Sequence, residues 1–388
     1  MDSEVSVMLH CGPSSGLEEH QVHAEISTRF NRRSVDEMEK HIEAVWNERV
    51  SREPWLFNGA KFRLHAAELS TTLQDTSKPY CNTSHQAATP TLTRETAKGG
   101  TQHGDHAASD LMPPRRVERE GASLAEIHTP GVNAECKKND SASETTETLR
   151  KDLSTLSSKT TPKPPDMLLR LQLGLTSYKD FLGTNWSREA ADLQQRGEVE
   201  FRDPQTFLAQ PLGVGAVLVT SDGYVVLLRR SRRVAEAAGL LDIPGGHPEP
   251  KAVCQGVCEE AISINLLKGR ERAVVAEIFS SVCVEVRDEV NVPLGYLSSP
   301  ALMGIALNRT SAGRPSAEFY IRCSLSMEEV KDFYWRGGPE AHESTDIVFL
   351  SRAEMLQLDE NASLWSELCP SAKGAVLLYQ LVRPDCLI

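Results

Sequence analysis

The chain has 388 residues, of which 25% are charged and 40% hydrophobic, and this ordinary composition excludes collagen-like, wholly disordered and disulfide-scaffold proteins. Its formal net charge of -12 disfavours general binding to nucleic acids or anionic membranes, because both would repel the protein. The sequence contains neither the ~18 apolar residues of a membrane span nor, at its start, a secretory signal. We therefore expect no nucleic-acid or membrane partner and a cytoplasmic location, with the nucleus as an alternative, while the oligomeric state stays open.

The nine cysteines are scattered and odd in number, and no Cys-x-x-Cys pair indicates a zinc site or a redox dithiol. We expect reduced thiols. Cys254 and Cys258 lie four residues apart and would share a face on a helix. Because no His or second pair lies nearby, solvated or half-buried thiols are the preferred interpretation.

The first 75 residues combine strand and helix patterns. Residues 5–9, 22–26 and 62–69 are apolar enough, and short enough, for strands. Between them Ser34 stands three residues before Glu37, which is the pattern of a helical capping box, and apolar residues then recur at helical spacing up to residue 50. We expect the first half of a small αβ lobe here.

Residues 76–166 differ from the rest of the chain. Of these 91 residues 23 are Ser or Thr, and only 11 are large apolar residues. Such a segment cannot bury enough apolar surface to offset the entropy lost on ordering. We predict a disordered insertion in a surface loop. The strand-like residues 167–175 follow it, so residues 167–210 should complete the lobe by pairing across the insertion.

From residue 211 the pattern becomes that of a second domain, which we extend to residue 388. A strand, a turn at Asp222 and Gly223, and a second strand come first. A helix over residues 273–289 forms the middle. Further strands are expected at 302–307, 318–323 and 347–350, and further helices at 327–333 and 372–382. The mixture predicts an α/β fold, an αβα sandwich with a mixed sheet.

Three carboxylates in the middle helix indicate metal chemistry. Glu285, Asp288 and Glu289 fall at i, i+3 and i+4, so they share one face within a turn. Their repulsion favours a hard divalent cation with oxygen ligands, Mg²⁺ as the first choice and Mn²⁺ as the alternative. An isolated motif of this kind is more often a solvated acidic face, but this one follows the loop GLLDIPGGHPEP (239–250).

The loop and the helix together resemble the Nudix box, which is Gly, five residues, Glu, seven residues and Arg-Glu-apolar-x-Glu-Glu-x-Gly-apolar. VEVRDEVNV (284–292) is similar to its second half. This sequence departs from the pattern by an interval at about residues 251–272, by Val284 in place of the Arg, by Asn291 in place of the final Gly, and by Ala276 in place of the first Glu. The resemblance implies that Glu285 and Glu289 are the catalytic metal ligands, with Asp288 as a third or water-mediated partner, and that Glu277 could hold a nearby water or a second ion.

The similarity extends to most of the chain outside the insertion. Blocks in the same order include the following: PWLF (54–57), KFRLH (61–65), LGLTSYKDFLGTNW (173–186), LRRSRRVAEAAGLLDIPGGHPEP (228–250), TSAGRPSAEFY (310–320), GGPEAHEST (337–345) and ELCPSAKGA (367–375). They resemble the branch of Nudix hydrolases that acts on UDP-glucose and UDP-galactose. The resemblance implies a Nudix fold and metal-dependent hydrolysis to UMP and glucose 1-phosphate or galactose 1-phosphate. A nucleotide-sugar binding protein with a decayed site, and a hydrolase of another nucleoside diphosphate derivative, are the alternatives.

A UDP-hexose calls for an aromatic surface for uracil and a cation for the diphosphate. Phe57 and Tyr178 are candidates for the uracil, although each is more often a core aromatic. Arg230 is the member of a basic cluster that the family resemblance assigns to the diphosphate, and the same resemblance places the backbone of Ala235 against the nucleotide.

The glycine turn and the last helix supply the other substrate candidates. Asp242, His247 and Glu249 surround Gly245 and Gly246 and suit sugar hydroxyls or bound water. Ser371 can offer a hydroxyl or a helix N-terminal amide to an anion, or simply cap the helix. The general base is left open among Glu277, Glu249 and Glu343, with His247 a less favoured base.

Overall fold

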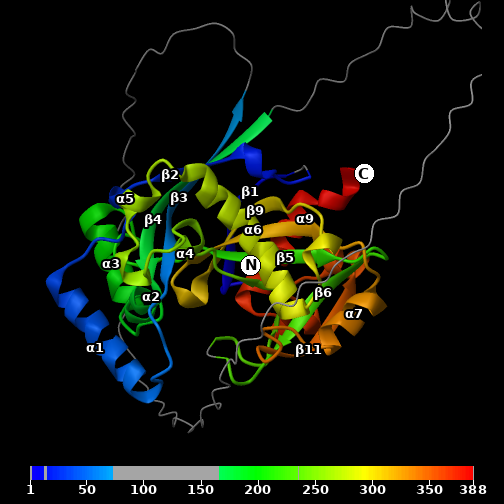
Figure 1. The fold of residues 1–388 in the computed structure, drawn as a ribbon. Helices are drawn as coiled ribbons and strands as arrows, with labels where there is room; N and C mark the ends of the chain where they lie inside the picture. The colour runs from blue at the N-terminus through cyan, green and yellow to red at the C-terminus, as the bar shows by residue number, and fades with distance from the viewer. Residues whose placement is uncertain (1, 13–14, 73–165, 235, 388) are drawn as a thin grey trace, which may run out of the picture. The chain divides into compact units, whose positions relative to one another are not determined.

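A mixed sheet of six strands, extended by two short ones, organises the structure, which is a computed structural model (Figure 1). Its strands run in the order β1 (Val5–His10), β9 (Ala301–Asn308), β10 (Arg314–Arg322), β5 (Gly213–Val219), β6 (Tyr224–Arg230) and β11 (Ser344–Ser351). Neighbours are antiparallel except β10 and β5, which are parallel. Two short strands, β7 (Leu241–Asp242) and β8 (Gly245–Gly246), pair with β6 and β5.

The structure describes residues 2–12, 15–72, 166–234 and 236–387, and these belong to one compact unit. The predicted insertion at 76–166 falls almost entirely outside them, as does Ala235. Within the described ranges, no helix is both long and apolar enough to cross a membrane.

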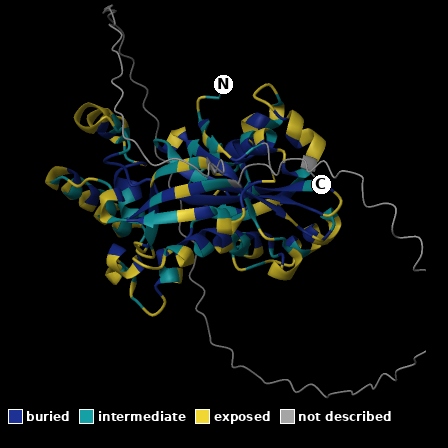
Figure 2. Ribbon diagram, turned by 90° about the horizontal axis from the view of Figure 1, so that it is seen from above, coloured by how far each residue is buried: buried dark blue, intermediate teal, exposed yellow. Residues whose placement is uncertain are grey.

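Helices cover both faces of the large sheet. Alternate residues of β5 divide between two cores, because successive side chains on a strand point to opposite faces. Val214, Ala216 and Leu218 pack in the core that contains α6 (Glu271–Val290), whereas Val217 and Val219 pack in the core that contains α9 (Pro370–Val382). Figure 2 shows buried residues concentrated in the strands between the helical layers. The predicted αβα sandwich is confirmed.

A second sheet of three strands lies on the far side of α6. Its order is β2 (Val22–Ile26), β4 (Asp166–Ser177) and β3 (Ala60–Thr72). The long antiparallel pairing of β3 with β4 ends at Thr72 and Asp166, the residues that flank the gap in the described chain. The predicted pairing of the two halves is therefore confirmed. Apolar residues of this sheet belong to the same core as α6.

The remaining helices are short, apart from two in the lobe. They are α1 (Asp36–Arg52), α2 (Tyr178–Gly183), α3 (Ala190–Phe201), α4 (Pro250–Val253), α5 (Ile264–Leu267), α7 (Met327–Trp335) and α8 (Arg352–Gln357). Strand β1 joins the edge of the large sheet, although it lies within residues 1–75 of the sequence. The division of the chain at residue 210 between lobe and hydrolase domain stays a prediction.

Two local expectations need correction. Helix α1 begins after Val35 with no side-chain cap, and the hydroxyl of Ser34 donates instead to Glu39 at 2.7 Å, so the predicted capping box does not form. Cys254 and Cys258 do not share a helix, because α4 ends before Cys254, which is buried while Cys258 is exposed.

One buried cation links strand β3 to two other segments of the lobe. Arg63 of β3 is 1% exposed, and its guanidinium donates to the main-chain oxygens of Leu208, Phe30 and Gln205 at 3.0, 2.8 and 2.7 Å. Two of these carbonyls belong to the segment before β5, and the third belongs to Phe30. The buried charge is therefore fully compensated by hydrogen bonds that tie strand β3 to the linker before β5.

Candidate active site

The glycine turn of β8 fits against the last two turns of α6. The backbone N–H of Gly245 donates to a carboxylate oxygen of Glu289 at 2.8 Å. A Cβ at Gly246 would overlap the carboxylate of Glu285, so only glycine leaves room for that side chain. The turn thus fixes both glutamates from the main chain.

Two further carboxylates converge on the end of α6 from the segment before β11. Oxygens of Glu289, Glu340 and Glu343 lie within 4.8 Å of one another, and the charges of Glu340 and Glu343 also act on Glu285. We call these four residues the acidic cluster. Among the described residues, no Lys or Arg forms an ion pair with any of them. Like charges at this separation are unfavourable without a cation.

This repulsion contributes to raised pKa values within the acidic cluster. Burial, together with the charges of Glu340 and Glu343, raises the pKa of Glu285 to about 7, and the N–H of His247 partly opposes that change. Burial and the charge of Glu285 raise the pKa of Glu289 well above its ordinary value, against the hydrogen bond from Gly245. Such shifts arise where a site lacks the positive charge that would stabilise its carboxylates.

Asp288 does not join the cluster as expected. Its carboxylate accepts two hydrogen bonds from Arg287, at 2.7 and 2.8 Å. Its main-chain oxygen instead accepts the N–H of Glu340 at 3.1 Å, which helps to hold the segment that carries Glu340 and Glu343. The cluster around Glu289 therefore contains Glu340 and Glu343 rather than the Asp288 carboxylate, and a water-mediated role for Asp288 stays a prediction.

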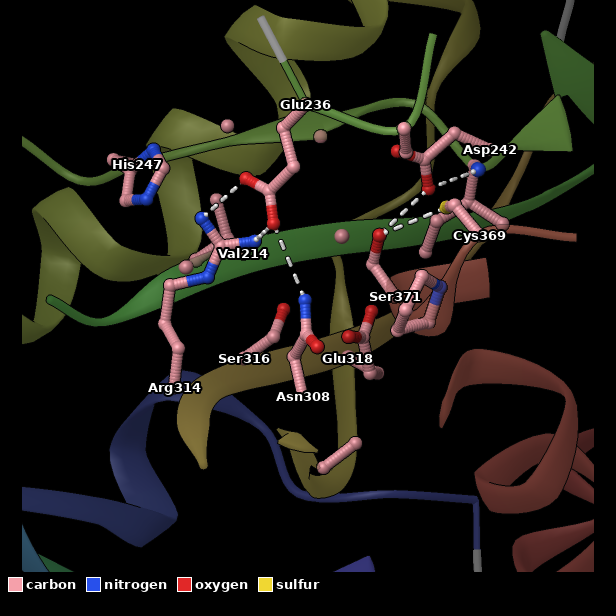
Figure 3. Close-up of a pocket in the computed structure, with 18 of the residues that line it drawn as sticks. Val214, Glu236, Asp242, His247, Asn308, Arg314, Ser316, Glu318, Cys369 and Ser371 are labelled. Carbon is pink, nitrogen blue, oxygen red and sulfur yellow. Dashed lines mark hydrogen bonds and ion pairs between the residues drawn. The ribbon is translucent and has the colours of Figure 1, made fainter. Parts of the chain in front are cut away.

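A polar cavity of about 240 Å³ adjoins the acidic cluster, and Glu343 lines both (Figure 3). Its other polar side chains come from separate strands, loops and a helix. They are Arg230, Glu236, Asp242, His247, Asn308, Arg314, Ser316, Glu318 and Ser371. Of the predicted substrate residues, Arg230, Asp242, His247 and Ser371 are brought together here. Glu236, Asn308, Arg314 and Glu318 were not predicted.

One wall of the cavity is built around Asp242. Its carboxylate pairs with Arg230 at 3.2 Å and accepts the hydroxyl hydrogen of Ser371 at 2.9 Å. Arg230 also donates through Nε to the main-chain oxygen of Glu236 at 3.1 Å. These contacts fix the guanidinium of Arg230 at the cavity, and no described residue accepts a hydrogen bond from its Nη2.

The opposite wall is built around Glu236. Its carboxylate accepts two hydrogen bonds from Arg314, both of 2.9 Å, and one from Asn308 at 3.3 Å. The guanidinium of Arg314 lies 5.3 Å from the centre of the Phe181 ring in α2. Residues of the lobe therefore support this wall. The only hint of Arg314 in the sequence was its place in the block TSAGRPSAEFY.

His247 and Glu249 diverge after the glycine turn. His247 lines the cavity, where burial and the positive charges of Lys61 and Arg314 lower its pKa well below its ordinary value, so the ring is a weak base. Glu249 is exposed outside the cavity and pairs with Lys61 at 2.8 Å. Its backbone N–H donates to Glu277 at 2.9 Å, so Glu277 supports this outer turn.

The two predicted uracil-stacking aromatics do not line the cavity. Phe57 is 73% exposed. Tyr178 packs edge-on against Trp46 and stacks on Phe181, with ring centres 6.4 Å apart in both pairs. Tyr178 is linked to the cavity only indirectly, since Phe181 supports Arg314. Roles for Phe57, Tyr178, Glu249 and Ala235 at the substrate stay predictions.

Curated proteins resemble the chain over almost its whole length. A bovine protein named uridine diphosphate glucose pyrophosphatase NUDT22 is 42% identical over 383 residues, which are 99% of each chain. Nudix hydrolase 9 of Arabidopsis thaliana is 35% identical over 55% of this chain and 65% of its own. No protein-family model matches. The chain belongs to the NUDT22 family of Nudix hydrolases.

Among solved structures, a MutT protein from Methanosarcina mazei Go1 aligns with 45% of this chain and 91% of its own. Its TM-score is 0.27 and its sequence identity is 15%.

Nudix hydrolases generally need a divalent metal ion. The acidic cluster of this NUDT22 relative fits such an ion, because its four side chains offer only oxygen donors and none of them forms an ion pair with a Lys or Arg among the described residues. The glycine turn would hold Glu285 and Glu289 in place whether or not an ion is bound. The cluster therefore provides the donor set, and the neighbouring cavity provides room for a polar ligand.

Proposed function

We propose that this chain hydrolyses UDP-glucose and UDP-galactose to UMP and glucose 1-phosphate or galactose 1-phosphate. The observation that carries the proposal is the acidic cluster, which forms no ion pair with a Lys or Arg among the described residues and adjoins a polar cavity. The near-complete match to proteins named uridine diphosphate glucose pyrophosphatase supports the substrate.

Glu285 and Glu289 would hold the ion, assisted by Glu340 and Glu343. Mg²⁺ is our first choice and Mn²⁺ the alternative. When bound, the ion supplies positive charge for the diphosphate oxygens and lowers the pKa of a coordinated water. The N–H groups of Gly245 and His247 keep the two carboxylates aimed at this position.

Glu343 is the best-placed general base. It lines the cavity and belongs to the acidic cluster, whereas Glu249 and Glu277 contact each other outside the cavity. We propose that Glu343 accepts a proton from a water whose oxygen forms a bond to one phosphorus. The bond from that phosphorus to the bridging oxygen then breaks, and the bridging oxygen leaves on the other phosphate.

Arg230 would meet the diphosphate. Asp242 and the main chain of Glu236 hold its guanidinium, which leaves Nη2 to bind a phosphate oxygen. Asp242, His247 and Ser371 would contact polar groups of the ligand from different sides of the cavity. Because Asp242 and Ser371 are already hydrogen-bonded to each other, little ordering entropy of these two side chains is lost on binding.

The decisive experiment is a hydrolysis assay of the purified protein with UDP-glucose, UDP-galactose, ADP-glucose and a nucleoside triphosphate, each with and without Mg²⁺. Phosphorus NMR should show UMP and hexose 1-phosphate from the uridine substrates, only when the metal is present. Tight UDP-glucose binding without product would instead make the protein a nucleotide-sugar binding protein. Faster hydrolysis of ADP-glucose or the triphosphate would assign it another substrate.

A further inference from the structure

Glu318 is a buried carboxyl group at the cavity that the steps above do not use. It lies in β10, is 0% exposed and lines the cavity. Neither of its carboxyl oxygens has a hydrogen-bond partner among the described residues. Figure 3 accordingly draws no dashed line to Glu318, whereas Asp242 and Glu236 are both joined to neighbours.

The described residues around Glu318 leave space for its carboxyl group but form no hydrogen bond with it. Gly215 is its register partner on β5, and a Cβ at that position would overlap a Glu318 oxygen. Ser316 offers the nearest hydroxyl but does not reach hydrogen-bond geometry with it. A buried polar group without a partner destabilises the fold. This loss of stability, together with the space that Gly215 leaves, indicates that the carboxyl group of Glu318 binds a ligand.

Burial raises the pKa of Glu318 to about 8, and Asp242 adds to this effect while Ser316 opposes it. Near neutral pH the carboxyl group is therefore mostly uncharged. A protonated carboxyl has one O–H donor and further acceptor sites, so it can pair with a group that both donates and accepts. It offers no positive charge to a phosphate.

We propose that Glu318 recognises an uncharged part of the nucleotide sugar, to which it both donates and accepts a hydrogen bond. Two parts of the ligand carry this chemistry, namely the hexose hydroxyls and the imide edge of uracil. The inference rests on the proposed function, and it adds a specificity residue that acts on neither the metal nor the phosphates.

The test compares Glu318→Gln with Glu318→Met. A carboxamide keeps a donor and an acceptor in nearly the same shape, whereas a thioether keeps only the volume. Calorimetry measures binding of UMP and of glucose 1-phosphate separately, and steady-state assays give kcat and KM for UDP-glucose. Thr176→Val is the matched control, because the Thr176 hydroxyl is also buried without a partner but does not line the cavity.

We expect Glu318→Met to weaken binding of one of the two ligands by about 10- to 100-fold and to raise KM for UDP-glucose by a similar factor. The ligand that is affected identifies the group that Glu318 contacts. Glu318→Gln should stay within about fivefold of the wild type. The melting temperature of Glu318→Met should equal or exceed that of the wild type, since an unsatisfied polar group has been removed.

Three results would overturn the inference. Unchanged binding and KM in both variants would mean that Glu318 serves the fold alone, for example through an enclosed water. Equal damage from Gln and Met in folded protein would mean that an ionised carboxylate is required. A lower melting temperature of Glu318→Met, with loss of both ligands, would mean a structural role. If the wild type itself neither binds nor hydrolyses these compounds, the proposed function fails first and the inference with it.

Discussion

Ionisable side chains are buried in two regions of the molecule, and their hydrogen-bond partners differ between the two. Within the lobe, Arg63 of β3 is 1% exposed and donates to three main-chain oxygens. At the end of α6, Glu289 is 7% exposed and receives one main-chain N–H, yet it faces further carboxylates. Glu318, in the adjoining cavity, has no partner among the described residues.

The contrast distinguishes buried ionisable side chains that stabilise the fold from those that bind a ligand. Burial lowers the pKa of Arg63 only to about 10, so the side chain remains a cation with its hydrogen bonds made. Burial raises the pKa values of Glu285, Glu289 and Glu318, and none of the three forms an ion pair with a Lys or Arg among the described residues. Substitutions in the two regions should therefore have opposite effects on stability and activity.

The largest effect should come from Glu289→Gln. Loss of one metal-binding charge should lower kcat/KM for UDP-glucose by about 1000-fold or more, while the free energy of unfolding of the metal-free protein stays equal or rises. Enzyme kinetics and urea denaturation measure the two quantities. Glu328→Gln removes an exposed charge from α7 and is the control. Near-normal activity of Glu289→Gln would remove this residue from the metal site.

Arg63→Met should show the reverse pattern. Three buried carbonyl oxygens lose their partner, so the free energy of unfolding should fall by about 3 kcal/mol or more. Arg52→Met is the matched control, since Arg52 is exposed and pairs only with exposed Glu48, and such pairs contribute about 0–1 kcal/mol. Urea denaturation compares the variants. An equally small effect in both variants would mean that the hydrogen bonds of Arg63 do not stabilise the fold.

A smaller effect should appear as pH dependence of the metal-free protein. The pKa of Glu285 rises from its ordinary value of 4.5 to about 7 on folding, so the native state holds a proton that the unfolded chain has released. The resulting stability is complete below pH 4.5 and is lost as the pH rises through about 7.

Between about pH 5.5 and 7.5, the wild type should therefore lose about 2 kcal/mol relative to Glu285→Gln. Urea denaturation in the presence of EDTA measures this difference, and saturating Mg²⁺ should reduce it. Parallel curves for the two proteins at all pH values would contradict the raised pKa.

Local patterns were enough to predict most of the framework. The alternation in β5 and the helical spacing in α6 reflect burial of one face, which a sequence displays directly. The register of Glu285 and Glu289 followed from the same spacing. The predicted capping box at Ser34 was wrong because the hydroxyl donates to Glu39 instead. The local sequence does not determine which of these acceptors the hydroxyl contacts.

The cavity was predictable only in part, because it assembles side chains from distant segments. Glu236, Arg314 and Glu340 each look like solvated charges in the sequence, and their meeting depends on tertiary packing. Glu318 did leave a signal, since it is an acid between Ala317 and Phe319 in a strand whose neighbours are buried. An acidic residue inside an apolar strand is rarely buried unless it is paired or has a function.

Removal of residues 73–165 is the largest change in sequence, and it should have the smallest effect on stability and activity. Replacing residues 73–165 with a short Asn-Gly turn would join Thr72 to Asp166, which are already register partners at the end of the β3–β4 pair. Because the cost of closing a loop grows only slowly with its length, the free energy of unfolding should change by less than about 1 kcal/mol. The kcat/KM for UDP-glucose should stay within about threefold, since every residue that we assign to structure or chemistry remains. Urea denaturation and steady-state assays of the shortened chain check both values. A large loss of activity with unchanged stability would show that the deleted segment acts on the site, and the division between structural and ligand-binding charge would then have to include a third region.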